Sequence, residues 1–124
     1  MPQALKITAG KIQVEAELND SPTAKSIFEA LPIKARGNRW GGEIYFTIPV
    51  RAELEADSRD VLEAGELGYW PTGSAFCIFF GPTPASEGKE IRAASAVNIV
   101  GTIKGDISQL PNVSDGVDVC IEAD

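Results

Sequence analysis

Alternating apolar positions dominate the start of the chain. Every second residue is apolar from Leu5 to Ala9 and again from Ile12 to Leu18, and Gly10 stands between the two segments. A period of two is that of a strand with one buried face. The pattern therefore predicts an N-terminal β-hairpin with its apolar face turned inward.

The period changes after residue 20. Ser21 is a good helix N-cap, Pro22 suits the first helical position, and Pro32 ends the apolar run. Between these residues the apolar positions recur at helical spacing, at Ala24, Ile27, Phe28 and Leu31. The spacing predicts one amphipathic helix over about residues 22–31, which caps a core.

The remainder of the chain again favours strands. The segments "IKARGNRW" and "EIYFTI" flank Gly41 and Gly42, which predicts a second hairpin. Alternation in its second strand places Ile44, Phe46 and Ile48 on one face and Glu43, Tyr45 and Thr47 on the other. Further strands are expected in "ELGYW", "SAFCIFFG", "SAVNIVGTI" and "GVDVCIEA". The acidic residues 51–64 predict an exposed loop or a short strand.

Many short antiparallel strands with one helix are typical of a closed or nearly closed β-barrel, because closure leaves no exposed sheet edge. The chain has 124 residues, which is the size of one domain, and residues 1–124 are therefore expected to form a single domain. The expected fold class is mostly β, with one main capping helix.

Charge and cysteine content narrow the range of partners and compartments. Eighteen acidic and eleven basic residues give a net charge of −7, which disfavours nucleic acid and anionic membrane surfaces as partners. No apolar run approaches the roughly 20 residues of a membrane helix, and "MPQALKITAG" is unlike a secretion signal. Cys77 and Cys120 each lie in an apolar segment and are interpreted as free buried thiols, in keeping with a reducing cytoplasm.

The chain contains no histidine. That absence excludes His-based catalytic triads and disfavours zinc–water sites. The sequence also contains neither a P-loop nor the glycine motif of dinucleotide-binding folds. We therefore expect no metal and no cofactor, and any catalysis would depend on carboxylates, Arg, Lys, Tyr or Cys.

Several segments, in the same order along the chain, resemble those of cyclophilins. "KIQVEAELNDSPTAKSIFEAL" is similar to the first strand, acidic turn and helix of that family, and "GSAFCIFFG" to its G-S-Q-F-F-I strand. "GELGYW" and "AVNIVGTIKGDISQL" match two further segments. In its small size and in the segment "WGGEIYF", the chain resembles still more closely the small prokaryotic cyclophilin-like proteins of unassigned function. The resemblance implies a closed eight-stranded antiparallel barrel with a helix over its end, and no particular activity.

The resemblance also implies where a peptidyl-prolyl isomerase would hold its substrate. The family's catalytic Arg corresponds to Arg36, with Arg39 as the alternative if the register slips. The positions of the other groove residues carry Ala75, Cys77, Arg92 and Val97 instead of Gln, Phe, Trp and His. Isomerase activity is therefore not expected, and whether the protein is an enzyme stays uncertain.

The segment "YWPTGSAFCIFFGPTP" contains the most distinctive apolar pattern. Alternation turns Phe76, Ile78 and Phe80 toward the core and leaves Ala75, Cys77 and Phe79 on the outer face. A solvated outer face would carry polar residues, so this one should be covered by a loop, a partner or a ligand. Trp70 is expected on the same outer side.

We hypothesise that Arg36, Glu43, Tyr45 and Trp70 form one side of a ligand pocket with Cys77 at its floor. Each residue also has a purely structural interpretation. Trp70 would plug the barrel end or pack under residues 51–64, and Tyr45 would be a cross-strand partner. Arg36 and Glu43 would form an exposed ion pair, and Cys77 would be inert.

Three functions stay open at this stage. The first is binding of a small molecule or short peptide in an outer-face groove. The second is a weak or residual peptidyl-prolyl isomerase, which would act against a barrier of about 18–20 kcal/mol. The third is a homo-oligomerisation or protein-interaction module that uses the same apolar face.

Overall fold

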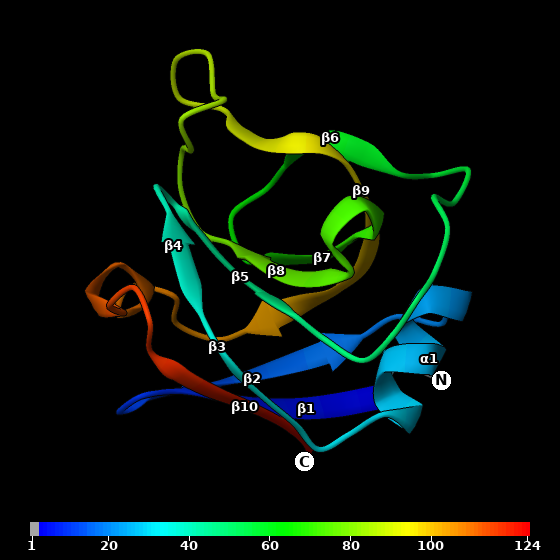
Figure 1. Ribbon diagram of the computed structural model, residues 1–124. Coiled ribbons are helices and arrows are strands. Elements are labelled where there is room, and N and C mark those ends of the chain that lie inside the picture. The colour runs from blue at the N-terminus through cyan, green and yellow to red at the C-terminus, as the bar shows by residue number, and fades with distance from the viewer. Residues whose placement is uncertain (1–2) are drawn as a thin grey trace.

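The computed structural model describes residues 3–124. One α-helix, α1 (Pro22–Glu29), and two short 3-10 helices, η1 (Pro71–Gly73) and η2 (Leu110–Asn112), accompany the strands. The strands are β1 (Gln3–Ala9), β2 (Ile12–Leu18), β3 (Ile33–Arg36), β4 (Asn38–Trp40), β5 (Glu43–Thr47), β6 (Arg59–Leu62), β7 (Glu66–Trp70), β8 (Ala75–Phe79), β9 (Ile91–Lys104) and β10 (Asp118–Ala123). The mostly β class is therefore confirmed (Figure 1).

The helix forms where the sequence predicts it. The Ser21 hydroxyl accepts a hydrogen bond from the backbone N–H of Ala24 at 3.2 Å, and Pro22 occupies the first turn. Thr23, Ala24 and Ile27 are buried. The helix ends at Glu29, two residues earlier than expected, because the N–H of the next residue turns back to the carbonyl of Ile27 at 3.0 Å.

All strand pairs are antiparallel, and the sheet runs in the order β3-β10-β1-β2-β9-β7-β8-β5-β4, with β6 on β9. The prediction of a closed eight-stranded barrel is not confirmed. The sheet has ten strands, and within residues 3–124 no ladder joins β3 to β4. These two strands follow each other in the chain with only Gly37 between them, so the segment changes partner from β10 to β5 at that residue.

The inner face of the sheet encloses the main core. Leu5, Ile7 and the inward residues of β2 lie in it, as do Phe46 and Phe76, whose rings stack with centroids 5.5 Å apart. Tyr69 is fully buried there, and its hydroxyl donates to the Val50 carbonyl at 2.6 Å. The inward faces predicted from alternation are thus confirmed.

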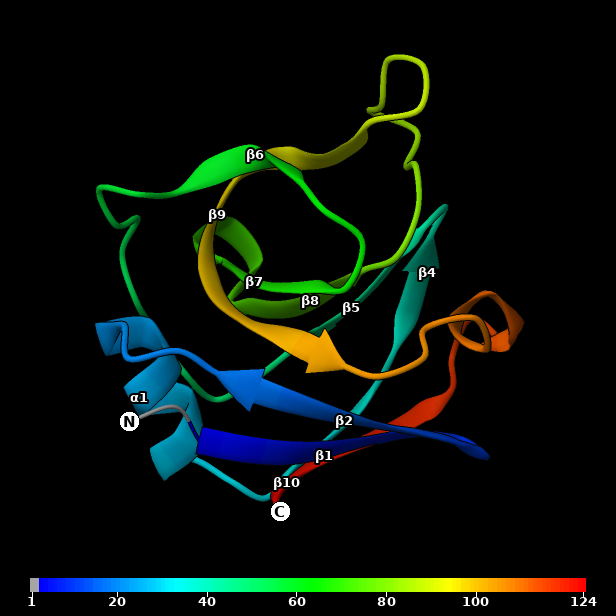
Figure 2. The same ribbon diagram turned by 180° about the vertical axis from the view of Figure 1, so that it is seen from behind.

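The apolar outer face of β8 is covered by the chain itself. Residues 59–62 of β6 and the first half of β9 form an arch on the far side of β7 and β8 from α1, as both views show (Figures 1 and 2). Under this arch a second, smaller cluster forms from Leu62, Ala75, Cys77, Phe79, Ile91, Ala93 and Val97. The segment thus supplies the cover that the outward-facing residues of β8 require.

Ion pairs hold the arch in place. The guanidinium of Arg59 on β6 donates to both carboxylate oxygens of Glu66 on β7, at 2.7 and 2.6 Å. Arg92 on β9 contacts Asp60 at 2.8 Å. A paired Arg–carboxylate fork fixes orientation as well as distance. Strand β9 therefore begins at Ile91, earlier than the segment "SAVNIVGTI" suggested, because β6 pairs with its first residues.

The loop before β6, residues 51–58, is attached to β9 by the buried side-chain amide of Asn98. Asn98 is fully buried, its oxygen accepts from the Glu55 N–H at 2.7 Å, and its nitrogen donates to the Glu53 carbonyl at 2.9 Å. The same nitrogen donates to the Thr23 hydroxyl at 3.0 Å, which joins the loop to α1. The acidic segment 51–64 thus contains both an anchored loop and the short strand β6.

Within residues 3–124, no helix is long and apolar enough to cross a membrane. In the same range no three Cys, Asp or Glu side chains gather so that they could hold a metal ion. Both cysteines are free. Cys77 is buried as predicted, but Cys120 is only half-buried, because Val119 and Ile121 take the inward positions of β10.

Candidate ligand pocket

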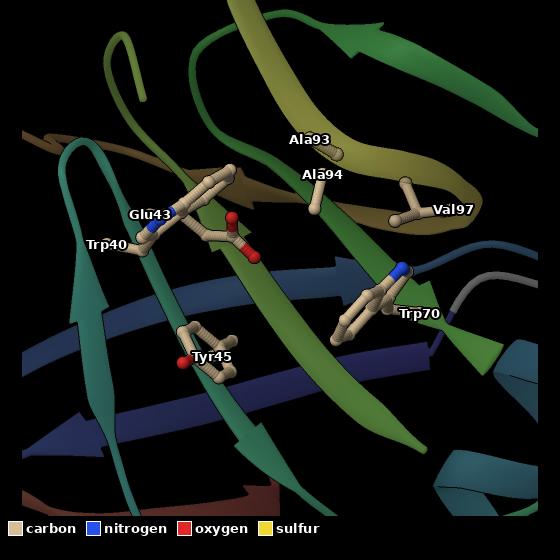
Figure 3. A pocket seen from close by; sticks show the side chains of 7 residues that line it. All are labelled: Trp40, Glu43, Tyr45, Trp70, Ala93, Ala94 and Val97. Atoms are coloured by element: carbon tan, nitrogen blue, oxygen red, sulfur yellow. The ribbon is translucent and has the colours of Figure 1, made fainter. Parts of the chain in front are cut away.

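A pocket of about 270 Å³ opens between the outer faces of β4, β5 and β7 and the first half of β9 (Figure 3). It is lined by Trp40, Glu43, Tyr45, Trp70, Ala93, Ala94 and Val97. Three of these side chains are aromatic and one is acidic, and none is basic. The three aromatic side chains are half-buried, so each keeps part of its surface open.

The β4–β5 hairpin supplies the first wall. Trp40 and Glu43 are a directly opposed pair that flanks the turn at Gly41 and Gly42, so both side chains project from the same face, with Tyr45 two residues further on. A Cβ on Gly42 would lie 2.2 Å from the backbone of Gly81. Only glycine lets the turn approach the neighbouring loop so closely, and this approach sets the position of the wall.

Strands β7 and β9 supply the opposite walls. Trp70 ends β7, and its indole N–H donates to the Ser95 hydroxyl of β9 at 2.6 Å. A Cβ on Gly68 would lie 2.8 Å from the Val97 side chain, so the missing side chain leaves room for Val97 above β7. The small side chains of Ala93 and Ala94 leave the remaining space open.

Glu43 is the unusual member of the set. Its side chain points into the space between the aromatic rings, yet the residue is only 6% exposed. Within residues 3–124 it has no ion-pair partner, whereas Glu66, the other buried acid, is paired with Arg59. Burial raises the pKa of Glu43 to about 7, and a hydrogen bond with Cys77 opposes that rise.

Cys77 lies behind the pocket wall. It pairs with Tyr45 across the β5–β8 ladder, and it is buried in the outer cluster. Its thiol has two acceptors within reach, the Glu43 carboxylate and the Ala75 carbonyl oxygen at 3.8 Å. Burial, and then the neighbouring Glu43 charge, raise the pKa of this thiol well above its usual range. It therefore stays protonated at neutral pH and acts as a hydrogen-bond donor.

Stability should depend on pH through Glu43. A carboxyl whose pKa is higher in the folded protein than in the unfolded chain binds its proton more tightly when folded, so its contribution is complete below the unfolded value of about 4.5 and disappears as the pH rises through about 7. We expect the free energy of unfolding of the wild type, minus that of Glu43→Gln, to fall across this window. Urea unfolding of both proteins at pH 4.5, 6 and 8 measures the difference. A difference that is constant with pH would contradict the assignment.

The structure brings together some of the predicted site residues and separates others. Glu43, Tyr45 and Trp70 line one pocket, as hypothesised, while Cys77 stands behind Glu43 instead of forming the floor. Arg36 is not in this pocket. Its side chain is 79% exposed on β3, donates to the Gly116 carbonyl at 3.3 Å and lies 3.9 Å from Asp118.

The separation of Arg36 follows from the change of partner at Gly37. Because β3 pairs with β10 instead of β5, Arg36 stands opposite Asp118, and the expected ion pair with Glu43 does not form. The alternative residue, Arg39, is not in the pocket either. Its guanidinium donates to the carbonyl oxygens of Gly41, Pro111 and Val113 and lies 5.0 Å from the Phe80 ring centroid.

Sequence reasoning missed four of the lining residues. Trp40 could have been predicted from the sequence, because a two-residue turn at Gly41 and Gly42 places it opposite Glu43 and on the same face of the hairpin. Ala93, Ala94 and Val97 had no such signal beyond the family resemblance, which placed Val97 where cyclophilins have His. They reach the pocket only because the first half of β9 crosses over β7 and β8.

An antiparallel sheet with one α-helix and a pocket on its outer face defines a small, mostly β protein with a candidate ligand site. The family model described as "Cyclophilin-like" matches residues 3–122, and the chain belongs to this family. Among solved structures, the chain is similar to the solution structure of the hypothetical protein AF2241 from Archaeoglobus fulgidus, with 45% identity and a TM-score of 0.86. That match covers 99% of this chain and 95% of the archaeal one. No curated protein matches the chain significantly.

Proposed function

We propose that this protein binds a small molecule in the pocket formed by Trp40, Glu43, Tyr45, Trp70 and the first half of β9. The observation that carries the proposal is the Glu43 carboxylate, which is 6% exposed, faces the pocket and has no ion-pair partner in residues 3–124. Burying an unpaired ionisable group costs free energy that the fold itself does not recover. Such groups, set in concave sites, are more frequent at functional positions than elsewhere.

The size of the pocket favours a small molecule over a short peptide. Its volume of about 270 Å³ lies just below the range for ligand sites, which begins at about 300 Å³. The β6–β9 arch also covers the outer face of β8, which includes Cys77, the position that the family resemblance assigned to a peptide groove. An extended peptide would have to displace that arch.

The same cover weakens the case for an oligomerisation face. In residues 3–124 the large hydrophobic side chains that are exposed are Leu54 and Val61, and each stands on a different segment. Interfaces that hold stable oligomers need a contiguous apolar patch of several hundred Å². The outward-facing residues of β8, which the sequence offered for such contact, are instead packed within the chain.

A fragment screen read by tryptophan signals tests the proposal directly. The chain contains two tryptophans, and both line the pocket, so their indole N–H resonances and fluorescence report on it alone. We expect at least one fragment to shift both indole resonances in a saturable manner. A broad screen in which no compound shifts either resonance, or in which all hits map to other surfaces, would overturn the proposal.

Prolyl isomerase activity is not expected. Arg36 is exposed on β3 and does not line the pocket, and Cys77, at the family's aromatic groove position, is buried under the arch. A coupled assay with Ala-Pro and Gly-Pro peptides should give no rate above the uncatalysed isomerisation. Turnover comparable to that of ordinary cyclophilins, lost in Arg36→Ala, would instead establish the enzyme.

A further inference from the structure

We propose that the pocket selects small organic cations, namely ammonium or alkylated ammonium groups on a compact apolar body. This inference rests on the proposed binding function and names the chemical class of the ligand. It follows from two properties of the lining, its aromatic faces and its single charge.

The aromatic side chains surround the carboxylate from separate strands. Trp40 stands on β4, Tyr45 on β5 and Trp70 on β7, and the Glu43 carboxylate lies in the space between them (Figure 3). The faces of aromatic rings carry negative potential and attract a cation held within about 6 Å of the ring centre, with Trp the strongest and alkylated ammonium groups the best-suited ligands. Three rings and one acid in a pocket of this size form a site for one such group.

The charge of the pocket has one sign. When it is ionised, Glu43 provides the negative charge, and none of the seven lining residues is Lys or Arg. A ligand carboxylate or phosphate would therefore meet like charge and no compensating positive charge in the lining, while a cation would supply the ion partner that Glu43 lacks. The net charge of −7 on the whole chain also favours the approach of cations.

The remaining wall suits alkyl groups better than a strongly hydrated head. Ala93, Ala94 and Val97 present methyl groups from β9. An alkylated ammonium contacts such methyl groups without losing hydrogen bonds to water, whereas a bare metal ion would find a single carboxylate and no further oxygen cage. The ligand class is therefore an organic cation in preference to an inorganic one.

Choline and its neutral carbon isostere, 3,3-dimethyl-1-butanol, separate charge from shape. Both are titrated into the full chain at pH 8.5 and low salt, where Glu43 is ionised, and binding is followed by tryptophan fluorescence and calorimetry. We expect choline to bind at least about 10-fold more tightly than the isostere, which corresponds to about 1.4 kcal/mol. Glu43→Gln should remove most of that preference without removing binding of the isostere.

Glu29→Gln is the matched control, because it removes the same charge from an exposed position on α1 outside the pocket. It should keep the preference for choline. Equal binding of choline and the isostere by the wild type would overturn cation selection but leave the pocket as a binding site. Fragments that bind at both tryptophans, with no affinity for choline or tetramethylammonium, would also overturn it. A pocket that takes no compound of any charge would overturn the proposed function itself.

Discussion

Phe76→Ala is expected to lower the free energy of unfolding by about 3–5 kcal/mol. The ring is fully buried in the main core and stacks on Phe46, so its removal leaves a cavity that the surrounding strands cannot fill. The neighbouring outward residue, Cys77, is also buried, but Cys77→Ala removes one heavy atom and should cost about 1 kcal/mol. Urea unfolding curves for both variants measure the difference.

This pair of substitutions compares the two faces of β8. Phe76 contacts the core enclosed by the sheet, whereas Cys77 contacts the cluster under the β6–β9 arch. Equal losses for the two variants would mean that the arch stabilises the fold as strongly as the core. A loss near zero for Phe76→Ala would contradict the inward assignment of β8.

Trp70→Ala is expected to weaken binding of any pocket ligand by about 30-fold or more, the factor that corresponds to loss of about 2 kcal/mol at a binding hot spot. The indole forms one wall of the pocket, and its N–H donates a hydrogen bond to the Ser95 hydroxyl, which connects that wall to β9. The thermal midpoint should fall by only a few degrees, because Trp70 is half-buried and lies outside the main core. Differential scanning fluorimetry and a ligand titration measure both quantities.

Trp70→Phe separates the ring from its hydrogen bond. It keeps an apolar aromatic face but loses the donor to Ser95, so binding should fall less than in Trp70→Ala. If Trp70→Ala instead lost about 3–5 kcal/mol of stability, as a truncated core residue does, and no ligand bound the wild type, then Trp70 would be a structural plug and the pocket would have no binding role.

Local patterns in the sequence were sufficient for most of the elements and for their buried faces. The alternation from Leu5 to Leu18, the cap at Ser21 and the inward set of β5 and β8 all depend on neighbours within a few residues, and the structure confirms them. The same alternation placed Glu43, Tyr45 and Trp70 on the outer side, where they meet. A period of two determines the face of a residue whatever the strand pairs with.

Which faces come together was decided only by the tertiary structure. Arg36 lies outside the pocket because the chain changes its pairing partner at Gly37, from β10 to β5. A single unpaired residue between two strands has no distinct pattern in the sequence. The same change of partner at Gly37 explains why, within residues 3–124, no ladder joins β3 to β4 and closes the sheet into a barrel.

The wall that β9 contributes to the pocket shows most clearly what the tertiary structure decided. Val97 reaches the site from β9 because β6 pairs with the start of that strand, about thirty residues away, and Arg59 ties β6 to β7 through Glu66. Pairing of distant segments depends on loop closure and on the summed packing of many side chains, which no local pattern records. The sequence by itself therefore determined most of the strands, the helix and three of the seven pocket residues, Glu43, Tyr45 and Trp70. The tertiary structure decided what covers them, which other residues line the pocket, and that Glu43 has no ion-pair partner there in residues 3–124.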